Sequence, residues 1–122
     1  MREDSPPRRE HDEAYLLGLR LDGRRVVVIG GGAVAARRVP RLLAAGADVM
    51  LVSPAVTPAL EELAAQGRID WQAREYRAGD CAMAWLVVAC AGPSPVNAAV
   101  ADEAERNRVW CVRADDAAAS TG

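Results

Sequence analysis

Short apolar runs alternate with longer amphipathic segments along this chain, and turn residues separate the two kinds. Continuous apolar runs are typical of strands that are buried on both faces of a parallel sheet, and a shorter stretch shows strict apolar–polar alternation. The strands predicted in this way span residues 25–29, 49–52, 69–74, 84–90 and 109–114.

Between these runs, apolar residues recur three or four positions apart, which is the spacing of one helix face. The predicted helices span residues 32–45, 58–65 and 96–106. Pro40 lies inside the first of them, and its ring predicts a kink or a local loosening, because proline lacks a backbone donor and clashes with the preceding turn. Gly46 is placed to end that helix.

Strands that alternate with helices predict an α/β fold: a Rossmann-like, doubly wound parallel sheet with helices on both faces. At 122 residues the chain is long enough for a single domain, which we assign to residues 15–122. Residues 1–14 are polar, charged and proline-containing, and are expected to form a flexible tail.

The stretch from Val26 to Ala35 points most directly to a function. An apolar run ends in Gly30, Gly31 and Gly32, and a helical pattern follows, with the spacing Gly30-x-Gly32-x-x-Ala35 of a dinucleotide-binding loop. Small residues there allow a sharp turn, a close approach of the backbone to a pyrophosphate, and tight helix packing. The alternative is a tight strand–helix turn without a ligand.

Several polar or turn segments follow the ends of other predicted strands. They are Ser53-Pro54, Ala91-Gly92 and Asp115. Ligands of such sheets bind outside the carboxyl ends of the strands, so these segments and the glycine loop should meet at one edge. Their convergence favours a binding site.

No carboxylate stands about 20 residues beyond the glycines, where an NAD site usually has one for the ribose diol. Ser53 could form a weaker hydrogen bond there. Arg37 and Arg38 could meet a 2′-phosphate, although helix arginines are more often solvated, and NAD is modestly preferred over NADP.

Two further polar residues each allow two interpretations. Asp115, just past a buried strand, is either a proton acceptor or metal-ion ligand, or a turn or N-cap residue. Asn97, near a helix start, is either a ligand contact or a local cap, and the cap is favoured.

Composition narrows the chemistry. Apolar residues make up 51% and charged residues 26% of the chain, and the formal net charge is −2, as in an ordinary globular protein that binds no nucleic acid. All 15 basic residues are arginine, which excludes a lysine Schiff base. The single histidine, His11, lies in the predicted tail, so histidine-based triads and metal sites are not expected.

The three cysteines are not in a Cys-x-x-Cys arrangement, and a reducing compartment suits them. No apolar run reaches the ~18 residues of a membrane span, and the N-terminus lacks a secretory pattern. We therefore expect a cytoplasmic protein with no membrane contact.

The order of motifs resembles the NAD-binding domain of the siroheme synthase family, whose members are precorrin-2 dehydrogenases and often also sirohydrochlorin ferrochelatases. The resemblance covers about residues 15–116. Its motifs are Leu19-x-Leu21-Asp22-Gly23 through the glycine loop, Leu43-x-x-Gly46-Ala47-x-Val49, Ser53-Pro54, Gly67-Arg68-Ile69-x-Trp71, Leu86–Ala89, Val96-Asn97 and Ala114-Asp115-Asp116.

The resemblance implies NAD-linked dehydrogenation of precorrin-2 to sirohydrochlorin, and in bifunctional members insertion of Fe²⁺ as a second substrate. It implies that Asp115 is the catalytic base and that Ala33, Val34, Pro54 and Ala55 lie against the cofactor. Arginines near strand ends, such as Arg113, would pair with carboxylates of the tetrapyrrole.

Family members are homodimers, and the segment that builds the dimer and much of the tetrapyrrole pocket follows the part that this chain resembles. We therefore expect the 122-residue chain to bind NAD, and we do not expect full turnover by this chain alone. The competing interpretation is a non-catalytic, NAD-binding regulatory module, which would not need Asp115.

Overall fold

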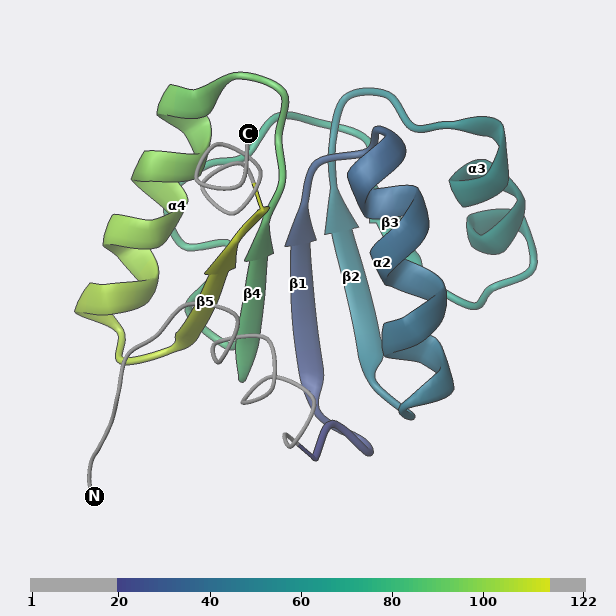
Figure 1. The fold of residues 1–122 in the computed structure, drawn as a ribbon, viewed down its shortest axis with the longest axis horizontal. Coiled ribbons are helices and arrows are strands. Elements are labelled where there is room, and N and C mark those ends of the chain that lie inside the picture. The colour runs from purple at the N-terminus through teal and green to yellow at the C-terminus, as the bar shows by residue number, and fades with distance from the viewer. Residues whose placement is uncertain (1–19, 115–122) are drawn as a thin grey trace, which may run out of the picture.

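The computed structural model describes residues 20–114 as a five-stranded sheet flanked by three helices (Figure 1). The strands lie in the order β3-β2-β1-β4-β5, and every neighbouring pair is parallel. The elements are β1 (Arg25–Ile29), α2 (Ala33–Ala44), β2 (Asp48–Val52), α3 (Pro58–Ala65), β3 (Asp70–Gln72), β4 (Leu86–Ala89), α4 (Ser94–Arg106) and β5 (Trp110–Arg113). This confirms the predicted Rossmann-like α/β fold. The predicted tail, residues 1–14, lies outside the described residues.

Two apolar layers cover the sheet, one on each face, because successive side chains of a strand point to opposite sides. Val26 and Val28 of β1 pack with Val39 of α2 and with α3. Val27 and Ile29 face the other way and pack with α4. Residues 26–29 are all at most 2% exposed, which explains why the first strand reads as a continuous apolar run.

The ends of several elements differ from the prediction. The predicted strands 69–74, 84–90 and 109–114 are each longer than the observed strand. Ile69, Ala84 and Cys90 are buried although they lie outside the strands, so burial of an apolar residue does not mark where a strand ends. Helix α4 begins at Ser94, earlier than predicted, since Pro95 is compatible with the first turn of a helix. Helix α2 continues through Pro40, whose ring is exposed while Val39 is buried.

The crossover from β3 to β4 contains no helix and is held by polar contacts. The Arg74 guanidinium donates two hydrogen bonds to the Asp80 carboxylate, at 2.8 and 3.0 Å. Burial raises the pKa of Asp80, but the hydrogen bonds from Arg74 and from the backbone N–H of Arg77 outweigh it, so the net pKa is lowered. The folded crossover thus holds Asp80 as a carboxylate.

Glu103 of α4 ties this crossover to the helix layer. Its side chain is buried and accepts hydrogen bonds from the Tyr76 hydroxyl and from the backbone N–H of Gly79. Burial and the contact with this carboxylate raise the pKa of Tyr76. Hydrogen bonds to a buried carboxylate are strong, so Glu103 fastens a crossover that has no helix of its own to α4.

Replacement of Glu103 by glutamine is expected to lower the free energy of unfolding by about 2 kcal/mol, because both hydrogen bonds lose their charged acceptor. Thermal unfolding followed by circular dichroism measures the effect. Glu105→Gln, on an exposed position of the same helix, is the matched control and should stay within about 0.5 kcal/mol of the parent. Equal stability of the two variants would contradict a role for Glu103 in holding the crossover.

Candidate functional site

Three loops meet at the carboxyl edge of the sheet. Ile29 of β1 pairs with Val52 of β2 on one side and with Ala89 of β4 on the other, so the loops that follow these residues are neighbours. This confirms that the glycine loop, Ser53-Pro54 and Ala91-Gly92 share one edge, as the sequence predicted. Asp115 lies outside the described residues.

Gly30 and Gly31 are enclosed by backbone from the neighbouring loops. A Cβ atom on Gly30 would lie 2.6 Å from the carbonyl carbon of Cys90 and 2.9 Å from the nitrogen of Ala91, and Gly30 has φ +133°. A Cβ on Gly31 would collide with the Ala55 carbonyl oxygen. These two glycines are therefore required by the packing of the protein against itself.

Gly32 differs from both, because no heavy atom lies within 4 Å of the place where its Cβ would be. It is the N-cap of α2, where no side chain supplies a capping hydrogen bond and no acidic residue occupies the first turn. Ala33 is exposed and Val34 is half-buried. Open space beside uncapped N–H groups and the positive end of a helix dipole suits a pyrophosphate. This part of the chain fits a dinucleotide.

The loop after β2 is fastened to the glycine loop. The backbone N–H of Thr57 donates to the Gly31 carbonyl at 3.0 Å, and the Ser53 hydroxyl donates to the Ala55 carbonyl at 2.6 Å. The indole N–H of Trp71 donates to the Ser53 carbonyl at 2.9 Å. Sequence reasoning did not assign Thr57 or Trp71 to this site, since only the pairing of β2 with β3 brings Trp71 beside Ser53.

Ser53 was predicted to reach a ribose hydroxyl. In the structure Ser53 is only 9% exposed, and its hydroxyl donates its hydrogen bond to the Ala55 carbonyl within the same loop. The exposed residues of this loop are Pro54 and Ala55, which the sequence also placed in the site. The loop can therefore offer a ribose the surface of these two residues, while Ser53 sets its shape.

The Asn97 side chain binds the turn before its helix instead of capping the helix. Helix α4 has Pro93 as its N-cap, without a side-chain capping hydrogen bond, so Asn97 does not cap its own helix. Its amide oxygen accepts from the backbone N–H of Ala91 at 2.8 Å, and its amide nitrogen donates to the Ala91 carbonyl at 2.9 Å. Asn97 is fully buried, and Ala91 is half-buried. The asparagine thus supports the β4–α4 turn from inside.

The two arginines considered for a 2′-phosphate lie on α2, and the arginine considered for a tetrapyrrole carboxylate lies at the end of β5. Arg37 is exposed and Arg38 half-buried, and both lie beyond the first turn of α2, which starts at Ala33. Arg113 is half-buried at the end of β5, where it pairs with Ala89 of β4. Of the three, Arg113 lies at the strand edge that the glycine loop occupies.

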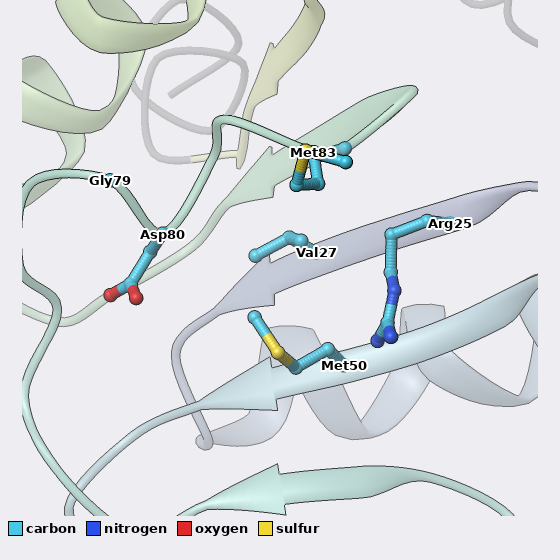
Figure 2. A pocket seen from close by; sticks show the side chains of 7 residues that line it. Arg25, Val27, Met50, Gly79, Asp80 and Met83 are labelled. Atoms are coloured by element: carbon cyan, nitrogen blue, oxygen red, sulfur yellow. The ribbon is translucent and has the colours of Figure 1, made fainter.

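A separate pocket of about 250 Å³ opens on the sheet face that α4 covers (Figure 2). It lies over β1 and β2, beside the crossover. Its walls are Arg25, Val27, Met50, Gly79, Asp80, Met83 and Ala84. None of the residues predicted for the dinucleotide site lines it.

The cysteine within the β3–β4 crossover is not a nucleophile. Cys81 is fully buried, and burial together with the nearby Glu103 carboxylate raises the pKa of its thiol to about 12. A thiol with such a pKa stays protonated at neutral pH and reacts slowly. Cys81 therefore serves as a small packing residue.

Among residues 20–114, no three His, Cys, Asp or Glu side chains gather closely enough to hold a metal ion. None of the helices in this part of the chain is both long and apolar enough to cross a membrane.

Comparisons with known proteins show which kind of domain this chain resembles. A family model described as "Putative NAD(P)-binding" matches residues 17–121. Siroheme synthase 1 of Serratia proteamaculans is 42% identical over 96 residues, which cover 79% of this chain and 20% of that protein. Precorrin-2 dehydrogenase of Bacillus subtilis is 35% identical over 88 residues, which cover 72% of this chain and 54% of that protein.

A solved structure, "SirC, precorrin-2 dehydrogenase", superposes with a TM-score of 0.71 at 28% sequence identity. The match covers 80% of this chain and 47% of that one. The chain thus spans about a fifth of the siroheme synthase and about half of the two dehydrogenases.

Proposed function

The chain belongs to the NAD(P)-binding family matched at residues 17–121, and we propose that it forms the NAD-binding part of an enzyme that dehydrogenates precorrin-2 to sirohydrochlorin. The observation that carries the proposal is the open, uncapped N-terminus of α2 at Gly32, directly after a buried strand. Relatives named siroheme synthase and precorrin-2 dehydrogenase support the choice of substrate.

The backbone N–H groups of Gly32, Ala33 and Val34 would hold the pyrophosphate of NAD, since nothing within the described chain caps them. Pro54 and Ala55 would lie against the ribose on the β2 side, and Ala91 on the β4 side. When bound, NAD would accept the hydride that leaves the reduced macrocycle. Gly30, Gly31, Ser53 and Asn97 maintain the shape of these loops.

Asp115 is proposed as the base that accepts a proton from the macrocycle as it is oxidised. It follows β5 by two residues, and β5 ends beside β4 at the edge that carries the glycine loop. A carboxylate at the carboxyl end of such a sheet can reach a ligand bound across it. Arg113, at the same edge, would pair with a carboxylate of the tetrapyrrole.

Three finer parts of the proposal rest on the relatives rather than on the described residues. The complete enzyme would be a cytoplasmic homodimer. It could also insert Fe²⁺, as a substrate, into sirohydrochlorin. The segments that complete the substrate pocket would lie in the part of the relatives that this chain does not span, since it covers 20% of the siroheme synthase.

The test combines NAD binding, by titration calorimetry, with NADH formation from precorrin-2, by absorbance at 340 nm. Asp115→Asn is expected to keep the NAD affinity within about twofold and to lower turnover by a factor of about 100 or more, the usual contribution of a general base. Asp116→Asn is the matched control, and it should behave like the parent chain.

Each alternative predicts a different result. NAD binding without turnover by the parent would mean that this chain is the cofactor half of a site completed elsewhere, or a regulatory module. Equal turnover by the parent and by Asp115→Asn would remove the assigned role of Asp115. Failure of the parent to bind NAD would overturn the proposed function itself.

A further inference from the structure

We propose that Asn97 is a positioning residue that sets the wall against which the nicotinamide half of the dinucleotide lies. This inference rests on the proposed function, because it assumes NAD as the ligand. The relevant geometry is the pair of hydrogen bonds by which the Asn97 side chain holds both backbone groups of Ala91, at 2.8 and 2.9 Å.

These two hydrogen bonds take the place of strand pairing just beyond the end of β4. The last pairing of β4 with β1 is at Ala89, and the N–H of Cys90 still donates to the Ile29 carbonyl at 2.9 Å. Ala91 has no strand partner, and a buried backbone group without one is costly. A side chain that both donates and accepts in one plane satisfies the two groups together, and the amide of asparagine does so.

The turn held by Asn97 forms part of the same wall as the glycine loop. A Cβ on Gly30 would lie within 3 Å of the Ala91 nitrogen, so the two backbones are in contact. Beyond Ala91, Gly92 is exposed and has open space beside it. Movement of Ala91 would therefore change the surface that the turn offers to a ligand at this edge.

The strand order assigns the two halves of the ligand to different sides. A dinucleotide crosses such a sheet where the strand order reverses, and its adenosine ribose lies at the end of the second strand. Here the reversal falls between β1 and β4, with β2 on the far side of β1. The ADP half would lie over the glycine loop and β2, and the nicotinamide half over the β4–α4 turn. Asn97 should therefore affect NAD but not ADP.

The experiment compares dissociation constants of NAD and ADP for the 122-residue chain and its Asn97→Ala variant, at a temperature where both are folded. The expected result is at least tenfold weaker binding of NAD, with ADP binding unchanged within about twofold. Asn97→Asp, which keeps the acceptor but lacks the donor, should have an NAD affinity between those of the parent and Asn97→Ala. Glu103→Gln is the control, since Glu103 is buried on the same helix and its side chain binds the crossover rather than Ala91. It should lose stability and keep both affinities.

A second measurement keeps the inference separable from the proposed function. In the ligand-free chain, the Ala91 amide should exchange its hydrogen at least tenfold faster in Asn97→Ala than in the parent. Equal losses of NAD and ADP affinity, or no loss of either, would overturn the positioning role. If the parent binds no NAD, the proposed function fails, while unchanged amide exchange at Ala91 would overturn the support of the turn by Asn97.

Discussion

Replacement of Gly30 by alanine is expected to lower the free energy of unfolding by about 3 kcal/mol or more and to abolish NAD binding at ordinary temperatures. Two costs add. The backbone of Gly30 has φ +133°, which a residue with a Cβ rarely adopts, and the new methyl group would lie 2.6 Å from the carbonyl carbon of Cys90. The atoms that the methyl group would meet belong to the backbone of Cys90 and Ala91, which cannot rotate away as a side chain can. The ends of β1 and β4 would therefore have to separate.

Gly67→Ala is the matched control for this prediction. Gly67 also has positive φ, +74°, but no heavy atom lies within 4 Å of its Cβ position. Gly67→Ala should therefore lower the free energy of unfolding by about 1 kcal/mol, the cost of the backbone conformation alone. Thermal and denaturant unfolding of both variants would measure the difference, and similar melting temperatures would show that the contact of Gly30 with the β4–α4 turn contributes nothing.

Replacement of Gly32 by aspartate is expected to have the opposite effect on stability and a large effect on binding. Gly32 is the N-cap of α2 with φ −94° and free space beside it, and aspartate is a preferred N-cap residue. The helix should be as stable as before or more stable, by about 0.5 kcal/mol. A carboxylate at the pyrophosphate site would repel NAD, and at an effective dielectric constant of about 20 the repulsion suffices for a 100-fold loss of affinity.

Gly32→Asn separates the effect of charge from the effect of size. Asparagine caps a helix about as well as aspartate and has nearly the same shape, but it carries no charge. Its loss of NAD affinity should be clearly smaller than that of Gly32→Asp, and only the loss caused by aspartate should shrink as salt is added. Unchanged NAD affinity in both variants would place the pyrophosphate away from this helix.

The sequence alone predicted the order and type of all the main elements. Continuous valine-rich runs could only be strands buried on both faces, and the helix from 58 to 65 was predicted with its observed bounds because Thr57 and Pro58 mark its start. The ends of the predicted strands were less predictable. Strands 69–74 and 84–90 proved shorter, because a strand ends where its partner ends, and no local pattern records the partner.

For the glycines of the candidate site, too, one part was predictable from the sequence and another part was not. The spacing of the glycines was sufficient to place the loop, since a backbone with unusual torsions and close contacts needs glycine at fixed positions. The sequence could not distinguish Gly30 and Gly31, which pack against Cys90 and Ala55, from Gly32, which faces open space. That distinction depends on loops that are far apart in the chain.

By itself, then, the sequence determined the fold class, the position of the glycine loop and the family, because each depends on local patterns of apolar residues and glycines. Only the tertiary structure decided what the polar side chains do. Ser53 directs its proton into its own loop, Asn97 holds the backbone of Ala91, and Glu103 binds the crossover. The physical reason is that a hydrogen bond depends on the distance and direction between two groups, and for a buried polar side chain the fold, rather than the neighbouring sequence, sets both.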